Sequence, residues 1–397
     1  MDAVTKLDLK VLVITDKSQV FSEYFPEKVI TINFEQWQES IENIRAWSVK
    51  FDLKAVIGVD EESIILAANL SEFLGIKHNS LESVKLTKDK YLMRKALKDS
   101  GLKSPWFKRF SVNETPKDIV TEISFPCVLK PTFLSASQGV IRADNVSEFC
   151  ISFEILSGLL SQEEMKIQGD DQANWILVEE YISGKEVSIE GIVNEGKLKE
   201  LAIFDKPEPL EGPTFPETIF ITPALLSEQL QISLLETAQT ALEALGIIKG
   251  PVHVELRINK NGNYILECAA RSIGGLCSKV LEFEGGMSLE ELILRSALGR
   301  NIEKTNLVGK AKGVMMLPTE KRGILREIRG AEAALSMKGI TEMEITIKPG
   351  EMLEPLPTGG RYLGFLFAEG KDQYSVIKDL KTAWSKIEII SEKIRFN

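Results

Sequence analysis

The first ninety residues alternate short apolar runs with segments of helical periodicity. Two apolar runs, at residues 11–14 (VLVI) and 55–59 (AVIGV), are typical of buried strands. Residues 61–74, after the second run, carry apolar side chains at helical spacing. Strands and helices that alternate in this way predict a small parallel α/β domain, which we place at residues 1–87.

A longer series of strands and helices predicts a second domain at residues 88–300. It opens with an amphipathic helix at residues 88–100, followed by the helix-ending residues Gly101 and Pro105. The pattern then predicts strands at 125–130, 175–181 and 186–193, a helix at 228–245, a hairpin at 252–270 and a helix near 288–298. Within this domain we expect residues 124–200 to form a small lid-like subdomain.

A proline-rich segment lies before the last quarter of the chain. Residues 207–223 (PEPLEGPTFPETIFITP) contain five prolines, which predicts a long ordered loop or a lid rather than a regular element. The tail mixes expected strands at 341–347 and 362–368 with a helix at 372–386. We therefore expect a third, α+β subdomain at residues 301–397, and an α/β chain overall.

The hairpin at residues 252–270 has a hydrophobic pattern that favours one register. Even-numbered positions are apolar in both arms, whereas Glu255 and Glu267 lie at odd-numbered positions. A two-residue turn at Asn261 and Gly262 would pair the apolar face of one arm with the charged face of the other. A three-residue turn with Gly262 in a left-handed conformation pairs even with even positions. We therefore predict this second register, in which Glu255 lies directly opposite Glu267.

Two carboxylates that face each other across a hairpin repel, so the pair has to be explained. One interpretation is a solvated outer face, on which Arg257 and Arg271 form salt bridges. The other is a divalent-metal site, because Mg²⁺ takes one or two carboxylates together with substrate phosphates. An arginine on the same face would then hold a phosphoryl oxygen through two hydrogen bonds. The hairpin alone leaves both interpretations open.

Two other segments carry charged residues at the ends of expected strands. Lys130 precedes a loop of small residues (PTFLSASQG) whose hydroxyl and backbone N–H groups could hold phosphates. This loop matches no Walker pattern. The strand at 175–181 contains the adjacent acids Glu179 and Glu180, which are also ordinary at a solvated strand end. Each signal alone therefore has a purely structural explanation.

Composition and charge narrow the function classes. The chain has 397 residues, of which 44% are hydrophobic and 27% charged, a globular mix that excludes disordered and collagen-like proteins. It has no apolar run near the ~20 residues of a membrane helix, and no signal peptide, so we expect a soluble, cytoplasmic protein. A net charge of −10 argues against a nucleic-acid partner. The four cysteines form no CxxC pair, so neither a zinc site nor a disulfide framework is expected.

Taken together and in order, these motifs resemble the signature of the ATP-grasp superfamily, as in biotin carboxylase and D-alanine–D-alanine ligase. The signature comprises a lysine in a helix, a lysine before a small-residue loop, V-E-E-Y-I with a glutamate after it, and E-x₁₁-E-x₃-R. The matching residues are Lys90, Lys130, 178–182, Glu186, Glu255, Glu267 and Arg271. The resemblance spans about residues 88–298 and implies an ATP-grasp fold of α+β type behind an α/β pre-domain.

The resemblance implies ATP as the nucleotide and Mg²⁺ as the metal, with Mn²⁺ as the alternative. Contacts to ATP would come from two lysines, a closing loop, the adenine-binding segment and a ribose-binding acid: Lys90, Lys130, Ser135, Ser137, Gly139, Glu179, Glu180, Ile182 and Glu186. Glu255 and Glu267 would hold the metal ions. Ala269 stands where the family usually has an asparagine, two residues after the second metal-binding glutamate, and this difference puts the second metal ion in doubt.

Within the superfamily, the chain is most similar to the L-amino-acid ligases that make dipeptides. Residues 204–223, 271–275 (RSIGG) and 360–368 (GRYLGFLFA) carry this likeness. It implies that ATP phosphorylates a substrate carboxylate and that an amine attacks the resulting acyl phosphate. The catalytic residues would be Lys130 and Arg271, which neutralise charge, and Gly274 and Gly275, whose backbone comes close to the acyl phosphate.

Two alternatives stay open beside this interpretation. One is an ATP-grasp enzyme with another acid and amine, carboxylase-like or purine-pathway-like. The other is a non-catalytic nucleotide-binding subunit, which Ala269 and the glycine-poor loop at 131–139 would allow. His253 is either a general base or a polar neighbour of the metal site. In every case we expect small-molecule substrates, no nucleic acid and no membrane, and the resemblance implies a homodimer.

Overall fold

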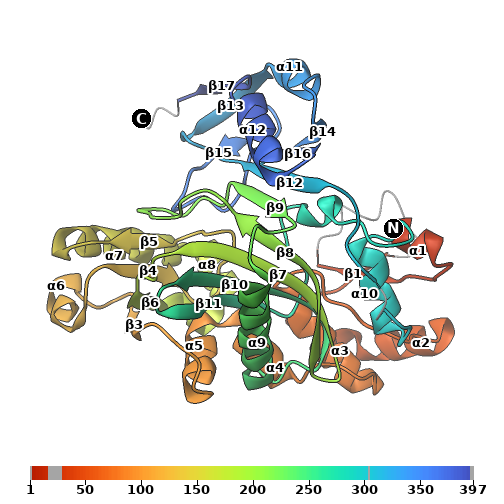
Figure 1. Cartoon of the computed structure of the whole chain (residues 1–397). Helices are drawn as coiled ribbons and strands as arrows, with labels where there is room; N and C mark the ends of the chain where they lie inside the picture. The colour runs from red at the N-terminus through yellow and green to blue at the C-terminus, as the bar shows by residue number, and fades with distance from the viewer. Residues whose placement is uncertain (1, 17–28, 303–304, 394–397) are drawn as a thin grey trace.

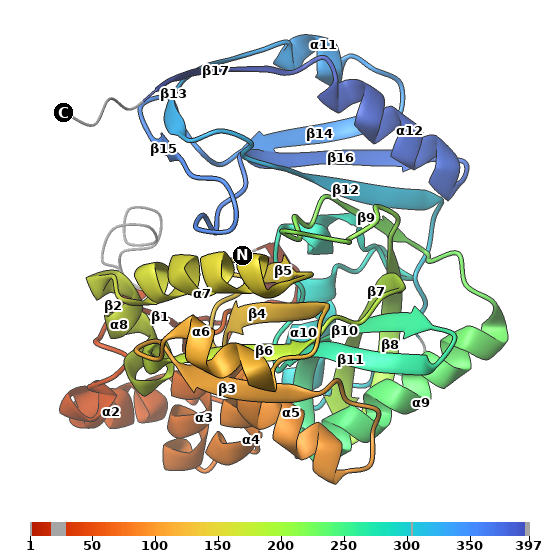
Figure 2. The same cartoon turned by 90° about the vertical axis from the view of Figure 1, so that its left-hand side faces the viewer.

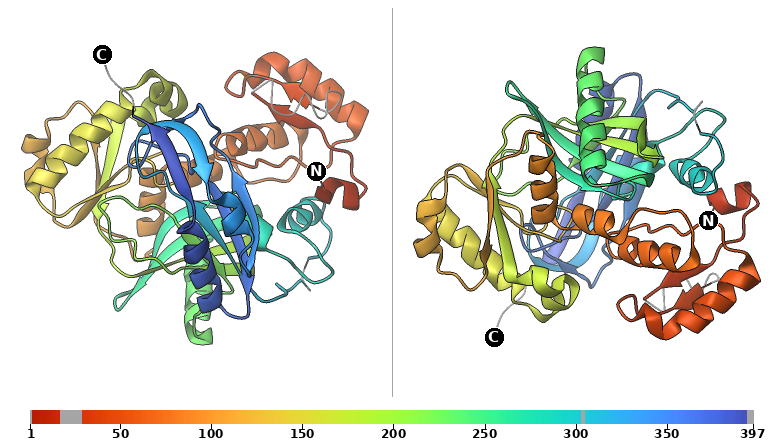
Figure 3. Two further views of the ribbon diagram at one scale, coloured as in Figure 1. Left: turned by 90° about the horizontal axis from the view of Figure 1, so that it is seen from above. Right: turned by 90° about the horizontal axis from the view of Figure 1, so that it is seen from below.

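An eight-stranded antiparallel sheet forms the centre of the computed structural model, which describes residues 2–16, 29–302 and 305–393. Its strand order is β11-β10-β7-β8-β9-β12-β16-β14. The N-terminal residues lie at one end of the molecule and a four-stranded sheet at the other, with the C-terminal residues above both (Figures 1 and 3). This mixed α/β arrangement confirms the predicted fold class.

The N-terminal part contains a parallel strand pair, but one of the two predicted strands is wrong. Strand β1 (Val13–Thr15) pairs with β2 (Val29–Thr31), and the helices are α1 (Asp2–Lys6), α2 (Ile41–Phe51), α3 (Ser63–Leu74) and α4 (Leu81–Lys88). No strand forms at residues 55–59 among the residues described. Val56 packs instead on an apolar cluster that includes Ile44 and Leu66. The helix predicted at 61–74 is confirmed as α3.

The four-stranded sheet, in the order β3-β6-β4-β5, forms a separate layer with helices on it (Figures 1 and 2). Its elements are β3 (Phe107–Ser111), α6 (Pro116–Ile119), β4 (Cys127–Pro131), β5 (Ile141–Ala143), α7 (Val146–Leu160), α8 (Glu163–Gly169) and β6 (Trp175–Glu180). Helix α7 begins after Asn145, whose side chain accepts the Glu148 N–H, and buries Phe149 and Phe153 in the core of this layer. The strands predicted at 125–130 and 175–181 are confirmed as β4 and β6, which are hydrogen-bonded neighbours.

The first part of the central sheet is built mostly from long strands, and helices α5 (Lys90–Asp99) and α9 (Glu228–Ala244) pack on one of its faces. It comprises β7 (Lys185–Asn194), β8 (Lys197–Lys206), β9 (Ile219–Thr222), β10 (Lys249–Asn259) and β11 (Gly262–Ala269). The two helices share an apolar core with Val187, Ile189 and Val254. Because side chains alternate along a strand, Glu186, Ser188 and Glu190 of β7 point to the opposite face.

The β10–β11 hairpin pairs Glu255 with Glu267, as the hydrophobic pattern predicts, but by a different route. The predicted three-residue turn is wrong, because Asn259 pairs with Gly262 across the two residues Lys260 and Asn261. A bulge then restores the expected register, since Glu255 pairs with Glu267 whereas the next residue, Leu256, pairs with Ile265. The bulge places Ile265 in the apolar core and leaves Leu266 facing the cavity described below.

The proline-rich segment contains a strand that the sequence pattern did not predict. Residues 207–218 are irregular, as expected, but residues 219–222 form β9, whose four residues are all buried. β9 pairs with both β8 and β12 (Ala311–Leu317). It therefore joins the first part of the central sheet to the strands of the chain's tail.

The tail extends the central sheet and adds a second, smaller one. Besides β12, its elements are β13 (Gly323–Arg329), α11 (Ala331–Leu335), β14 (Ile340–Ile345), β15 (Met352–Leu353), β16 (Gly364–Gly370), α12 (Gln373–Trp384) and β17 (Glu388–Glu392), and α10 (Leu289–Ala297) precedes them. β14, β16 and α12 confirm the predicted elements. Because the central sheet continues across residue 300, the domain bounds at 87 and 300 stay a prediction.

In the described part of the chain, no helix has the length and apolar character needed to cross a membrane.

Candidate functional site

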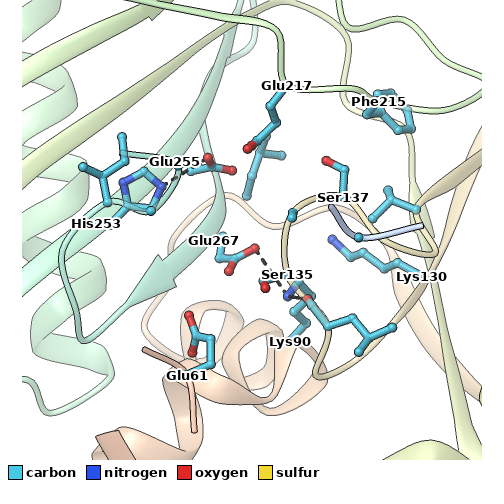
Figure 4. A pocket seen from close by; sticks show the side chains of 18 of the residues that line it. Glu61, Lys90, Lys130, Ser135, Ser137, Phe215, Glu217, His253, Glu255 and Glu267 are labelled. Carbon is cyan, nitrogen blue, oxygen red and sulfur yellow. Dashed lines mark hydrogen bonds and ion pairs between the residues drawn. The ribbon is translucent and has the colours of Figure 1, made fainter. Parts of the chain in front are cut away.

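A cavity of about 690 Å³ opens where the N-terminal part, the four-stranded layer, the central sheet and the tail meet. Of the residues that the sequence assigns to a site, all except Gly139 line it. Figure 4 shows several of these side chains pointing into the cavity from different elements. Gly139 packs away from it, where a β-carbon would come within 2.6 Å of Pro131.

Lys130 and Glu179 form a buried ion pair on the neighbouring strands β4 and β6. Arg94 of α5, which the sequence analysis missed, also binds Glu179, with its Nε 2.8 Å from Oε2. Burial opposes the charge on Glu179, but Arg94 and Lys130 outweigh it and lower the pKa of this carboxyl to about 2. Both carboxylate oxygens are thus engaged by cations, and the adenine role of Glu179 stays a prediction.

Lys90 and Lys130 flank the small-residue loop at 132–138. Lys90 Nζ donates to the Leu134 carbonyl at 2.7 Å and lies 3.3 Å from Glu267 Oε2. Burial lowers the pKa of Lys130 to about 8, against the attraction of Glu179. Ser137 has a φ of 57°, a left-handed conformation that is costly for a residue with a side chain and is common at functional sites.

Glu180, Ile182 and Glu186 already have partners around the predicted adenine and ribose site. The Glu180 N–H donates to the Trp106 carbonyl at 2.8 Å, and its side chain is exposed. Arg257 holds the Ile182 carbonyl at 2.6 Å and Glu186 Oε2 at 2.9 Å. These residues line the cavity, but their contacts to a nucleotide remain predictions.

The paired hairpin carboxylates are held by different groups. Glu255 Oε1 accepts a hydrogen bond from Lys206 Nζ at 2.7 Å and lies 3.2 Å from His253 Nε2, whereas Glu267 faces Lys90 (Figure 4). Burial opposes ionisation of both acids, but the nearby cations outweigh it and lower their pKa values. Two ionised carboxylates that face a cavity fit the preference of Mg²⁺ for one or two carboxylate ligands, whereas the side chain of Ala269 offers no ligand.

Lys206 is the residue of this site that sequence reasoning missed most completely. Its ammonium group lies 2.7 Å from Glu186, 2.9 Å from Glu217 and 2.7 Å from Glu255. Oxygens of these three acids lie within 4.8 Å of one another, close enough to share a metal ion, although here they surround the ammonium group. A lysine at a strand end before a proline was the available signal, but no local pattern indicates three acids around it.

Three carboxylates share one ammonium group, so they do not all ionise with equal ease. Burial raises the pKa of Glu217 to about 7, with repulsion from Glu255 adding to it and Lys206 opposing it. Burial opposes the charge of Lys206, but its acidic neighbours raise its pKa well above the usual value. Lys206 is therefore charged at neutral pH, and Glu217 takes up a proton more readily than an ordinary glutamate does.

Arg271 and the glycines after it form the other side of the cavity. Arg271 Nε lies 2.6 Å from Oε1 of Glu61, a residue of the N-terminal part that the sequence analysis missed. Gly275 has a φ of 59°, and a β-carbon there would come within 2.3 Å of Met316 Cε. The left-handed conformation favours glycine at this position, and a side chain there would require the flexible end of Met316 to move.

His253 lies between two acids on the same face of the sheet. Its Nδ1 contacts Glu190, and its Nε2 lies near Glu255. Burial opposes the charged imidazolium, but Glu190 and Glu255 together raise the pKa of His253 to about 10. A histidine that is already protonated at neutral pH cannot accept a proton, which favours the polar-neighbour interpretation over the general base.

Comparison with known proteins shows which families and folds this chain resembles. Residues 123–280 match the family model described as "ATP-grasp domain", and residues 315–392 match "L-amino acid ligase C-terminal domain 2". Alanine–anticapsin ligase of Bacillus subtilis (strain 168) is 29% identical over 272 residues, which cover 65% of this chain and 56% of that protein. An L-arginine-specific L-amino acid ligase of Bacillus subtilis is 22% identical over 302 residues, covering 75% of this chain and 71% of that one.

Among solved structures, an L-amino acid ligase from Bacillus licheniformis has a TM-score of 0.84 at 23% identity. The superposition covers 99% of this chain and 95% of that chain, so the two share a fold along their lengths. The match to alanine–anticapsin ligase, in contrast, spans only about half of that relative's length.

Proposed function

Because residues 123–280 match the ATP-grasp domain and residues 315–392 match the C-terminal domain of L-amino acid ligases, we propose that the chain is an ATP-grasp ligase that joins two amino acids in an ATP-dependent reaction. The carboxylate of one amino acid takes the γ-phosphoryl group of ATP, giving an acyl phosphate and ADP. The amine of the second amino acid attacks the acyl carbon and loses a proton. Phosphate then leaves and an amide bond remains.

The observation that carries the proposal is the convergence of opposite charges in one cavity. Glu255 and Glu267 lie opposite each other on the hairpin, and the cations Lys90, Lys130 and Arg271 line the same space. Phosphoryl transfer requires mainly positioning and neutralisation of charge, which this arrangement supplies. A solvated outer face, the alternative for the hairpin, does not fit two acids and a lysine that are largely buried.

In this proposal each charged group has a task. Glu255 and Glu267 hold the divalent ion, which when bound neutralises the phosphates of ATP. Lys90 and Lys130 contact those phosphates beside the 132–138 loop, and Glu179 and Arg94 keep Lys130 in place. Arg271 lines the same cavity as the hairpin acids and would stabilise the phosphoryl group in transfer.

The acyl phosphate must be protected from water, and the proline-rich segment and the tail would exclude water from the cavity. Phe215 and Leu210 of the proline-rich segment line the cavity, as do Tyr362 and Phe365 of the tail. The Gly139 N–H donates to the Pro357 carbonyl at 2.7 Å, so the small-residue loop and the tail are in contact. These contacts support a role for the tail in closing the site.

Amino acids are favoured as substrates by the relatives rather than by a single pocket residue. The tail matches the C-terminal domain of L-amino acid ligases, and two relatives are named as ligases of amino acids. We include in the proposal a dependence on Mg²⁺, with Mn²⁺ as the alternative, and a homodimeric, cytoplasmic enzyme. Another acid and amine, or nucleotide binding without catalysis, are the competing outcomes of the test.

The test is release of phosphate from ATP and Mg²⁺ with amino acids offered singly and in pairs, with the products read by mass spectrometry. We expect release to depend on a particular pair, with a product mass equal to the sum of the two less one water. Glu267→Gln should abolish turnover, whereas Glu195→Gln, an exposed acid paired with Lys77, should leave it unchanged. Binding of ATP without release for any pair would refute the proposal.

A further inference from the structure

Glu190 is a buried acid that the proposed chemistry does not use. It lies on β7, is 1% exposed and does not line the cavity. Both of its oxygens nevertheless have partners, Oε1 with His253 Nδ1 and Oε2 with the N–H of Ile273. A buried carboxylate is costly unless it is paired in this way, so its partners indicate what it does.

The first partner connects Glu190 to the hairpin acids. His253 lies directly opposite Glu190 in the β7–β10 ladder, and its other ring nitrogen lies 3.2 Å from Glu255 Oε1. Lys206, the other group that holds Glu255, is shared with two further acids. The Glu190–His253 pair therefore holds Glu255 through a contact that Glu186 and Glu217 do not share.

The second partner connects Glu190 to the substrate side of the cavity. Glu190 Oε2 accepts the Ile273 N–H at 3.0 Å, and the next two residues, Gly274 and Gly275, line the cavity. A β-carbon on Gly274 would meet nothing within 4 Å, so no side chain packs closely against this residue, whereas Gly275 lies against Met316 of the tail. The hydrogen bond to Glu190 thus fixes where the 273–275 loop begins.

We propose that Glu190 is a positioning residue that links the divalent-ion site at Glu255 to the 273–275 loop on the substrate side. This inference rests on the proposed function, in which Glu255 binds the ion and the loop approaches the acyl phosphate. Ala269, which stands at the position of the family asparagine, lies opposite His253 in the other ladder and has no polar group. His253, oriented by Glu190, supplies the polar contact to Glu255 that residue 269 does not.

The variant that tests the link is Glu190→Gln. Glutamine keeps the size of the side chain and an acceptor for the Ile273 N–H, but it removes the negative charge beside His253. Groups that orient metal ligands typically change metal affinity or activity by about 10- to 100-fold when they are mutated. We expect Glu190→Gln to weaken Mn²⁺ binding by about tenfold or more, and His253→Gln to weaken it similarly. The double variant should be no weaker than the worse single variant.

The binding assay uses Mn²⁺ titrated by electron paramagnetic resonance in the presence of a non-hydrolysable ATP analogue with a β,γ-imido bridge. Glu200→Gln, an exposed acid on β8, is the matched control and should bind Mn²⁺ like the wild type. Thermal unfolding of each variant tells a loss of fold from a loss of binding. If Glu190→Gln does not fold, His253→Gln carries the test, because it breaks the same link from the other end.

The outcomes separate this inference from the proposed function. A wild-type protein that does not bind Mn²⁺ with the nucleotide analogue would overturn both. Mn²⁺ binding by the wild type with an unchanged affinity in Glu190→Gln would overturn only the link. A lower unfolding temperature with unchanged Mn²⁺ affinity would assign Glu190 a purely structural role, and it would also overturn the link.

Discussion

Replacing Lys206 by methionine should destabilise the protein strongly and in a pH-dependent way. The side chain of Lys206 is 3% exposed, and its ammonium group lies within 2.9 Å of Glu186, Glu217 and Glu255. Methionine has a similar length and no charge, so it removes the cation without leaving a large cavity. Three acids would then face one another with no cation among them.

The magnitude follows from the distances. Removing one partner of a buried ion pair typically costs about 3–5 kcal/mol, because the other charge is left uncompensated. Two like charges 4.8 Å apart, the limit for the oxygens of these acids, repel by about 3.5 kcal/mol at an effective dielectric constant of about 20. We therefore expect the free energy of unfolding to fall by about 3–5 kcal/mol at pH 8.

The deficit should shrink at lower pH, because the acids can take up protons in place of the lost cation. In the wild type Glu217 already has a pKa raised to about 7 by burial. Without Lys206 the folded variant binds protons more tightly than the folded wild type does. Each additional proton reduces the deficit by up to about 1.4 kcal/mol per pH unit as the pH falls from 8 to 6.

Urea denaturation at pH 6 and pH 8 measures both quantities. Lys197→Met is the matched control, since Lys197 is exposed at the other end of the same strand, and it should change stability by less than about 0.5 kcal/mol. A loss below about 1 kcal/mol in Lys206→Met that is the same at both pH values would refute the reasoning. It would mean that the three acids do not depend on this cation.

Three further predictions concern single groups of the site. The raised pKa of Glu217 should lower the free energy of unfolding of the wild type by about 3 kcal/mol as the pH rises from about 4.5 to 7. Glu217→Gln should lack this part of the decline in urea unfolding, and parallel pH profiles of the two proteins would contradict the prediction. Arg94→Met should lower the free energy of unfolding by about 3–5 kcal/mol, because it removes a cation from the buried Glu179. A loss under about 1 kcal/mol in urea unfolding would mean that Lys130 alone compensates the charge of Glu179. Gly275→Ala should lower the free energy of unfolding by about 1 kcal/mol or more, because residue 275 has a left-handed φ of 59°. Gly274→Ala should be nearly neutral, because a β-carbon there meets nothing within 4 Å. Equal unfolding temperatures for the two variants would contradict this prediction.

The sequence was sufficient to determine the elements that depend on local pattern. Helices α3, α5 and α9 lie where apolar periodicity and ending residues place them. The pairing of Glu255 with Glu267 was also predictable from the apolar pattern of the hairpin, although the turn that this pattern favoured is not the one that forms. The order of lysines, acids and arginine further indicated the superfamily and the residues that line the cavity.

Several features were decided only by the tertiary structure, because they depend on neighbours that are remote in sequence. The run at 55–59 is as apolar as a strand, but no strand of the described residues pairs with it. Strand β9 could not be predicted from its proline-rich surroundings, because its pairing with β8 and β12 makes it a strand. The bulge at Leu266 is set by packing of Ile265 in the core, which no turn rule reveals.

The partners of the charged residues were likewise beyond the sequence. Arg94 and Glu179 are 85 residues apart, and Lys206 lies 20 and 49 residues from Glu186 and Glu255. Side-chain type and spacing show which groups can be charged, but the electrostatics of a buried group depend on which charges the fold brings within a few ångströms of it. The sequence alone therefore determined the kinds of residue in the site, and the tertiary structure decided which cation stabilises which acid.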